Sequence, residues 1–275
     1  MGQASVSAVI PTKNVAGFIR PTLESLRFCD EVVIVDMFST DDTRAVCELY
    51  PNVKFHQRED YIYGNFNYGV EQATGDWILR IDSDEVISQE LRESILKVLR
   101  CPAPKFLHYD AVYHMYFLGC RLRYGFGTGW RTTLFRRGTA RYPVKGEHEG
   151  LDVSGPAGKL DGHYDHFTNP SLSTWVAKLN YYTDRDAERI DPPVPLGRLR
   201  LVYMTLRFFQ RLYFSRNGLY KDGYFGFVVA SLCAFSLFLQ YCKVWERSLV
   251  EEARELDPVG AVPEISDKET NSCYP

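Results

Sequence analysis

Short apolar runs alternate with stretches of helical spacing through the first hundred residues, and this alternation constrains the fold more than any other feature. The predicted strands are the apolar, largely β-branched runs at residues 5–10, 31–35, 53–56 and 77–81. The predicted helices fill the intervals, at residues 16–28, 41–50 and 65–73, and then from the N-cap Ser88 to about Leu99. Strands that alternate with crossover helices predict a parallel, doubly wound sheet, and therefore an α/β fold.

The pattern changes after residue 106. Residues 109–118 are rich in aromatic side chains, residues 132–136 form another short predicted strand, and glycines punctuate the interval between them. This pattern predicts an added, partly antiparallel lobe with long loops, where binding residues tend to lie. We expect the chain to divide into an α/β domain at residues 1–170, a helical region at 171–256 and a disordered polar tail at 257–275.

Charge and cysteine content exclude several classes of protein. A formal net charge of −3 gives no general attraction to nucleic acid. The seven cysteines are an odd number without a C-x-x-C pair, which argues against a disulfide framework and against a zinc module. They indicate reduced thiols in a cytosolic compartment. The N-terminus lacks a basic region followed by an apolar run, so we expect no secretory signal.

The predicted helical region joins a basic stretch to an uncharged one. Between Asp191 and Asp222 there is no acidic residue, whereas six basic residues are interleaved with apolar and aromatic ones. Residues 223–242 carry no charge and have about the length that spans a bilayer. The pattern predicts a membrane-associated element that spans, dips into or lies on the membrane. The alternatives are a buried helix of a soluble subdomain, with its arginines on a solvated face, and RNA binding, for which no recognised motif is present.

An acidic turn follows the fourth predicted strand directly. It reads Asp82-Ser83-Asp84-Glu85. Open α/β sheets bind ligands at the carboxyl ends of their strands. Two carboxylates at positions i and i+2 can share one hard cation, and Mg²⁺ or Mn²⁺ prefers such oxygen ligands. The turn therefore predicts a cation site that neutralises a diphosphate, and the alternative is an ordinary solvated turn.

Three segments of this half carry a family resemblance. They are Ser7-Ala8-Val9-Ile10-Pro11-Thr12-Lys13-Asn14, Glu31-Val32-Val33-Ile34-Val35-Asp36-Met37-Phe38-Ser39-Thr40-Asp41-Asp42-Thr43 and Ala73-Thr74-Gly75-Asp76-Trp77-Ile78-Leu79-Arg80-Ile81-Asp82-Ser83-Asp84-Glu85. In this order and spacing they resemble family 2 glycosyltransferases with the GT-A fold, over residues 5–100. Within that family the chain looks most similar to bacterial lipopolysaccharide-core glucosyltransferases. The narrower resemblance rests on Lys145-Gly146-Glu147-His148-Glu149, His163-x-x-His166 and Asp222-Gly223-x-x-Gly226.

The resemblance implies roles for residues at the ends of the predicted strands. Those that would contact the nucleotide sugar are Pro11, Thr12, Asn14, Asp36, Arg58, Asp60 and Asp82. Asp36 would accept hydrogen bonds from the base, and its alternative role is that of a turn residue or helix cap. A surface salt bridge is the alternative for Arg58 and Asp60. Asp82 and Asp84 would address the ribose and the metal-bound diphosphate, with Asp84 as the direct metal ligand.

An inverting sugar transfer also needs a carboxylate that takes the proton of the acceptor hydroxyl. The family's acidic motif in the second half of the domain matches His148-Glu149 here. The resemblance therefore assigns the base to Glu149, with Glu147 second and Asp161 and Asp165 as outside candidates. A loop of charged surface residues is the alternative.

Two histidines and a group of arginines have two interpretations each. His163 and His166 lie on either side of Asp165 in the sequence. Their functional interpretation is that they complete a cation site or contact a phosphate, and the alternative is a purely structural role. We assign His166 to the metal site together with Asp82 and Asp84. Three arginines lie around the strand at residues 132–136, where they would clamp a phosphate or line a solvated edge strand: Arg131, Arg136 and Arg137.

These inferences combine into one functional hypothesis. We expect residues 1–170 to be a nucleotide-sugar-binding catalytic domain of a metal-dependent, inverting glycosyltransferase. It would move a hexose from a UDP-sugar to a lipid-linked glycan such as a lipopolysaccharide core, and the expected hexose is glucose. The enzyme would lie on the cytoplasmic face of a bacterial inner membrane as a peripheral or monotopic protein. The alternatives are transfer to a polyprenyl phosphate or another envelope polysaccharide, a nucleotidyltransferase, and a non-catalytic membrane scaffold.

Overall fold

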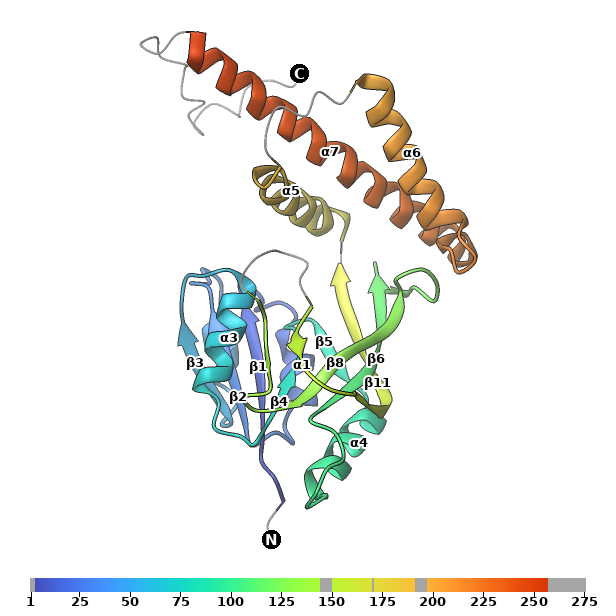
Figure 1. The fold of residues 1–275 in the computed structure, drawn as a ribbon. Helices are drawn as coiled ribbons and strands as arrows, with labels where there is room; N and C mark the ends of the chain where they lie inside the picture. The colour runs from blue at the N-terminus through green and yellow to red at the C-terminus, as the bar shows by residue number, and fades with distance from the viewer. Residues whose placement is uncertain (1–2, 144–149, 170, 191–196, 257–275) are drawn as a thin grey trace.

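The computed structural model describes residues 3–143, 150–169, 171–190 and 197–256. Its first half contains four parallel strands in the order β3-β2-β1-β4 (Figure 1). They are β1 (Val6–Thr12), β2 (Glu31–Asp36), β3 (Val53–Gln57) and β4 (Trp77–Arg80). Every residue of β1 and β2 is buried, which explains their nearly continuous apolar runs. The predicted parallel sheet and the α/β fold class are confirmed for this half.

Four helices cover the two faces of these strands. They are α1 (Ile19–Ser25), α2 (Thr43–Cys47), α3 (Ile62–Gln72) and α4 (Gln89–Arg100). Ser88 caps α4 as predicted, since its hydroxyl accepts a hydrogen bond from the Leu91 amide at 3.2 Å. The helix predicted at residues 41–50 is shorter than expected because the Asp41 carboxylate forms a turn with the Thr43 amide, so α2 begins after it.

The two faces of the sheet carry separate apolar cores, as strand alternation requires. On one face, Ala8 and Ile10 pack with residues of α1, α2 and α4. On the other face, Val9 packs with Phe66 of α3. This second contact depends on Gly69 of α3, because a Cβ atom there would lie 2.5 Å from a Val9 methyl group.

The second half continues the same sheet instead of forming a separate lobe. The strands are β5 (Glu85–Ile87), β6 (His108–Phe117), β7 (Cys120–Arg121), β8 (Thr128–Arg136) and β11 (Gly158–Asn169). The order beyond β4 is β8-β6-β11-β5, and β7 pairs with β6. The pairs β4–β8, β6–β8 and β5–β11 are antiparallel, whereas β6–β11 is parallel, so the whole sheet is mixed. A small ladder joins β9 (Ala140–Arg141) to β10 (Asp152–Val153).

A helical region lies beyond the carboxyl ends of β6 and β11 (Figure 1). It consists of α5 (Leu172–Glu188), α6 (Arg198–Phe214), the 3-10 helix η1 (Leu219–Asp222) and α7 (Gly223–Leu256). Leu219 packs with Phe117 and Leu122 of the sheet in one buried cluster. The Asp222 carboxylate accepts a hydrogen bond from the Tyr124 amide at 3.0 Å. Leu219 and Asp222 thus connect the helices to the end of β6 and to the loop between β7 and β8.

Large apolar side chains remain exposed on α6 and α7. They include Leu199, Val202, Tyr203, Leu206, Tyr224, Phe235 and Trp245. Among the described residues, one helical stretch is long and apolar enough to cross a membrane, Leu219–Val250, and only 22% of its most apolar window is buried inside the protein. A helix in the core of a soluble domain would be mostly buried, whereas this stretch leaves much of its apolar surface uncovered by the described chain.

Candidate active site

The predicted acidic turn lies between β4 and β5, at the carboxyl edge of the parallel strands. Two hydrogen bonds close it: the Glu85 amide donates to the Asp82 carbonyl at 3.1 Å, and the Asp82 amide donates to Glu85 Oε2 at 2.8 Å. The hydroxyl of Thr22 in α1 donates to the Ser83 carbonyl at 2.9 Å. On the far side, β5 pairs with β11 so that Glu85 lies opposite His166. The turn is therefore fixed from both sides, and the pairing with β11 places His166 beside the carboxylates.

Two arginines neutralise the buried part of this acidic cluster. Asp82 Oδ2 lies 3.4 Å from Arg80 Nη2 and 3.3 Å from Arg131 Nη1, and Arg131 also forms an ion pair with Glu85. Burial alone would raise the pKa of Asp82, but Arg80 and Arg131 outweigh it and hold that pKa well below its ordinary value. Glu85 is fully buried, and burial raises its pKa despite the attraction of Arg131. Asp82 is thus an anion at neutral pH.

Asp84 and His166 face each other beside these pairs. Asp84 Oδ1 lies 3.2 Å from His166 Nε2, and Lys178 Nζ of α5 lies 3.8 Å from Asp84 Oδ2. Burial would lower the pKa of His166, but its hydrogen bond to Asp84 and the nearby Glu85 charge raise that pKa overall. Ligand atoms of Asp82, Glu85 and His166 lie within 4.8 Å of one another. Carboxylate oxygens with one imidazole suit Mn²⁺ well and Mg²⁺ through the oxygens, so the donor set fits the predicted cation.

A cavity of about 710 Å³ opens above the turn. Its floor contains Pro11, Asp82, Asp84 and His166, and Lys178 lies at its side. Its opposite wall comes from α5, α6 and α7 and is mostly apolar, although Asp186, Ser236 and Gln240 also line it. That wall includes Trp175, Leu179, Tyr182, Phe208, Cys233 and Leu237. The cavity therefore joins a charged floor on the sheet to an apolar wall on the helices, which suits a ligand with one polar and one apolar part.

Three predicted nucleotide-contacting residues lie together at the ends of β1 and β2. Thr12 is paired with Asp36 in the sheet, and its hydroxyl donates to Asp36 Oδ1 at 3.1 Å. Asp36 is buried and also accepts hydrogen bonds from the Ser39 amide and hydroxyl at 2.8 and 2.5 Å. Asn14 accepts a hydrogen bond from the Thr40 amide at 2.8 Å. In this conformation Asp36 therefore caps the turn after β2, which is the alternative role considered for it.

Arg58 and Asp60 follow β3 and form an ion pair with each other at 2.8 Å. Arg58 also donates to the Gly64 carbonyl at 3.1 Å and lies over the Tyr68 ring at 5.0 Å. Its backbone amide donates to the Asp36 carbonyl at 2.9 Å, which places the pair next to the β2 end. The salt bridge expected as the alternative is present, at a position where nucleotide contact is also feasible.

Glu147 and Glu149, the two predicted base residues, lie outside the described residues. Their assignment remains a prediction.

The sequence analysis missed three contributions to the site. The sequence indicates Glu85 only as a member of the acidic run. In the structure its carboxylate accepts a hydrogen bond that closes the turn and forms an ion pair with Arg131. Arg131 was assigned to a phosphate or to a solvated edge, but β8 lies between β4 and β6, and Arg131 points inward. Lys178 was not identified at all. The position of Lys178 in an amphipathic helix does not indicate that it belongs to the site, because only the tertiary fold places α5 over the turn.

Comparisons with known proteins agree with the resemblance seen in the sequence. The model of the glycosyl transferase family 2 domain matches residues 7–108. A lipopolysaccharide core biosynthesis glycosyltransferase, LpsC of Rhizobium meliloti, is 30% identical over 268 residues, which cover 92% of this chain and 96% of LpsC. An uncharacterized glycosyltransferase of Rickettsia felis is 28% identical and covers 89% of this chain and 90% of its own length. Residues 1–349 of S. aureus TarS with UDP-GlcNAc superpose with a TM-score of 0.43 at 17% identity, covering 86% of this chain and 81% of that one.

Proposed function

The chain belongs to glycosyltransferase family 2, and from that premise we propose that it transfers a hexose from a UDP-sugar to a lipid-linked glycan. The proposal takes glucose as the sugar and a lipopolysaccharide core as the acceptor. The observation that carries it is the position of Asp82, Asp84 and His166 on the floor of a cavity at the carboxyl edge of the sheet. That edge is where open α/β sheets bind nucleotides.

The donor diphosphate would lie against the acidic turn. Asp84 and His166 would hold Mg²⁺ or Mn²⁺, with Asp82 beside them. When bound there, such a cation neutralises the charge that develops on the leaving diphosphate. Lys178 Nζ lies close enough to Asp84 to contact the same phosphate oxygens. The uridine would extend toward Thr12 and Asn14 at the ends of the parallel strands.

Arg80 and Arg131 serve a different purpose in this mechanism. Both form ion pairs with Asp82 and are largely buried, so neither is free to swing toward a substrate. Their charges keep Asp82 ionised, which preserves an acceptor for the ribose hydroxyls. A protonated Asp82 would instead donate a hydrogen bond and would no longer attract a cation.

Transfer with inversion requires one further carboxylate. We assign it to Glu149, with Glu147 as the second candidate. The carboxylate takes the proton of the acceptor hydroxyl while that oxygen bonds to the anomeric carbon and the bond from this carbon to the diphosphate breaks. The products are the glycosylated acceptor and a nucleoside diphosphate.

The helical wall of the cavity supports an amphiphilic acceptor. Side chains of α5, α6 and α7 there are mostly apolar, and other apolar side chains on α6 and α7 are exposed outward. A membrane-facing α6–α7 pair would bring a lipid-linked glycan to the cavity from the bilayer surface. The name of the Rhizobium meliloti relative supports the same class of acceptor. We place the enzyme on the cytoplasmic face of the inner membrane, where UDP-sugars are available.

A panel of nucleotide sugars tests the proposal. Each is incubated with Mn²⁺ or Mg²⁺, with and without bacterial membrane extract, and nucleoside diphosphate and pyrophosphate are measured separately. We expect UDP release from UDP-glucose that requires both metal and extract. Pyrophosphate release would indicate a nucleotidyltransferase, and stimulation by purified polyprenyl phosphate in place of the extract would indicate the alternative acceptor. A folded protein that binds no UDP-sugar with either metal would contradict the proposal.

A further inference from the structure

A second group of potential metal ligands lies on the sheet face opposite the acidic turn. Side chains alternate between the faces of a strand, so along β11 His163 and Asp165 lie on one face while Tyr164 and His166 lie on the other. In the parallel pairing with β6, Asp165 is opposite His114. His114, His163 and Asp165 therefore share a face, and the body of the sheet separates them from His166 and Asp84.

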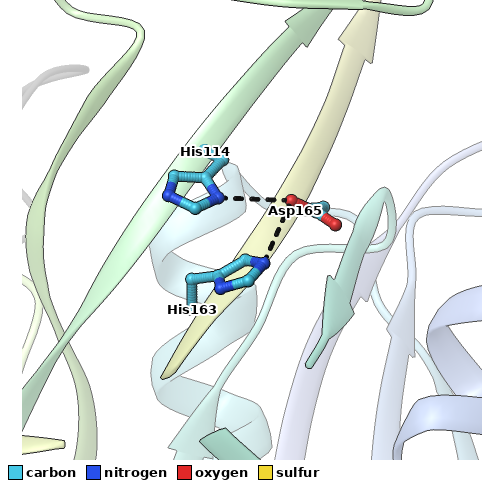
Figure 2. Close-up of side chains that lie close together, drawn as sticks. All are labelled: His114, His163 and Asp165. Carbon is cyan, nitrogen blue, oxygen red and sulfur yellow. Dashed lines mark ion pairs between the residues drawn. The ribbon is translucent and has the colours of Figure 1, made fainter. Parts of the chain in front are cut away.

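The three side chains converge on one oxygen atom. Figure 2 shows both imidazole rings pointing at the Asp165 carboxylate. Oδ1 of Asp165 lies 3.6 Å from Nδ1 of His114 and 3.7 Å from Nε2 of His163. The two imidazole rings are 4.2 Å apart between centroids. All three ligand atoms lie within 4.8 Å of one another.

Two buried polar atoms of this group have no hydrogen bond. Nδ1 of His114 and Oδ1 of Asp165 are both buried, and neither has a hydrogen-bond partner in the described structure. The 3.6 Å between these two atoms exceeds the roughly 2.7–3.2 Å that is typical of N–H···O hydrogen bonds. Burying a carboxylate oxygen without a hydrogen-bond donor is unfavourable, which indicates that a partner of this oxygen is missing.

A metal ion supplies that partner with little rearrangement. Ligands about 2.0–2.1 Å from a tetrahedral zinc ion lie roughly 3.3 Å from one another. The two imidazole-to-carboxylate distances, 3.6 and 3.7 Å, already approach this value. The neighbouring cation, Arg121 on β7, lowers the attraction for a metal, but its side chain is exposed and solvent screens its charge.

We propose that His114, His163 and Asp165 bind a divalent transition-metal ion of the zinc class. Two imidazoles and a carboxylate favour such a metal over Mg²⁺, which prefers oxygen ligands alone. Three protein ligands leave a fourth position for water. This site is distinct from the one formed by Asp84 and His166, and it does not rest on the proposed transfer reaction.

The site would act as a clamp between two strands. The pairing of β6 with β11 shifts register between Lys159 and His163 and again between His166 and Asn169. The segment from His163 to His166 is therefore a short paired stretch between two irregularities. A metal that bridges β6 and β11 within this stretch would hold it in register, and with it the strand that presents His166 to the acidic turn.

Co²⁺ provides the test, because a four-coordinate site gives it a visible absorption band. The full chain is treated with chelator, dialysed into excess Mg²⁺ to occupy the oxygen-rich site, and titrated with Co²⁺. We expect one equivalent to bind with a visible band that Zn²⁺ abolishes. His163→Gln and Asp165→Asn should each weaken binding more than roughly 100-fold, since even outer-shell changes cost about 10–100-fold in metal affinity. His56→Gln removes an imidazole elsewhere in the sheet and should leave the band unchanged.

Two further measurements keep the outcome decisive. Circular dichroism confirms that each variant is folded, and His163 suits this purpose because its side chain is 35% exposed. Asp84→Asn should keep the Co²⁺ band even though it removes a ligand of the other site. The proposal is overturned if the folded wild-type chain binds no Co²⁺ in excess Mg²⁺, or if the band persists in both His163→Gln and Asp165→Asn.

Discussion

Asp84 Oδ1 lies 3.2 Å from His166 Nε2, which joins the turn after β4 to the strand β11 from the other end of the domain. The contact exists because β5, the three-residue strand that begins at Glu85, pairs with β11 rather than with its sequence neighbours. A turn that carries two aspartates would otherwise be free to move. The pairing thus fixes the carboxylates of the acidic turn relative to the only imidazole that faces them among the described residues.

Asp84→Asn should abolish sugar transfer while the protein remains folded. The substitution removes the charge that would hold the cation, and we expect kcat for UDP release to fall by more than roughly 100-fold, beyond the cost of an outer-shell change. Glu71→Gln is the matched control, since Glu71 is an exposed carboxylate on α3. Near-normal turnover in Asp84→Asn would mean that this carboxylate does not bind the metal.

Arg131→Met should destabilise the protein strongly, because it leaves Glu85 buried without its main counter-ion. Breaking a buried pair from one side costs about 3 kcal/mol or more, which corresponds to a fall in Tm on the order of 10 °C for a chain of this size. The double variant Arg131→Met/Glu85→Gln should recover part of the loss, since glutamine is neutral. Thermal denaturation of the four proteins gives the coupling directly, and purely additive losses would contradict a buried ion pair.

Glu31 should make stability depend on pH in the acid range. Burial would raise its pKa, but Lys54, Ser7 and Thr74 lower it from 4.5 to about 2 in the folded chain. Because the folded pKa lies below the unfolded one, the stabilisation is complete above about pH 4.5 and is lost as the pH falls toward 2. Glu31→Gln should therefore cost on the order of 1–3 kcal/mol at pH 7 and progressively less below pH 4.5.

Urea denaturation at several pH values between 7 and 3 measures this difference. Glu48→Gln serves as a control, because its ion pair with Arg44 is exposed and contributes little. A stability difference for Glu31→Gln that stays constant over the whole range would show that the ionised carboxylate is not the stabilising form.

Charge reversal of Arg207 and Arg211 should weaken binding to anionic membranes. Both side chains are exposed on α6, where apolar residues such as Leu206 also face solvent. Each basic residue near an anionic surface contributes about 1 kcal/mol, so Arg207→Glu/Arg211→Glu should lower vesicle affinity at least roughly 10-fold. Co-sedimentation with phosphatidylglycerol vesicles measures the effect.

The control for this experiment reverses two charges at the far end of the molecule. Lys97 and Arg100 are exposed on α4, which lies away from α6 and α7 (Figure 1). Lys97→Glu/Arg100→Glu should leave vesicle binding almost unchanged. Equal losses in both variants would indicate a dependence on net charge alone, and no loss in either would mean that α6 does not recruit the chain to membranes.

The parallel half of the fold could be predicted because its local signals agree. Residues 32–35 are β-branched and buried on both faces, and Ser88 caps a helix of regular amphipathic spacing. The position of the acidic turn then follows, since it comes directly after β4, which pairs in parallel with β1. Each of these conclusions needs only residues that are close together in the sequence.

The second half could be predicted only in part: the strand at residues 132–136 and the partly antiparallel pairing are found, but β11 lacks an alternating apolar pattern. His163 and Asp165 face one side, while Tyr164 and His166 face the other, so polar residues occupy both faces of the strand. Such a segment resembles a loop when it is read locally. Arg131 was misread for a related reason, since an arginine in a strand is normally at a solvated edge unless a buried carboxylate such as Glu85 lies opposite.

The ion pairs of the site have a consequence for the order in which the chain is made. Asp82, Asp84 and Glu85 leave the ribosome before Arg131, His166 and Lys178, which supply most of the positive charge around them. Of the cations around the turn, Arg80 alone is made before β8, β11 and α5, and it pairs with Asp82. Because chains fold progressively from the N-terminus during translation, the parallel half of the sheet lacks these counter-charges until late in synthesis. The charge balance of the acidic turn is therefore complete only once α5, the last of these segments, has been made.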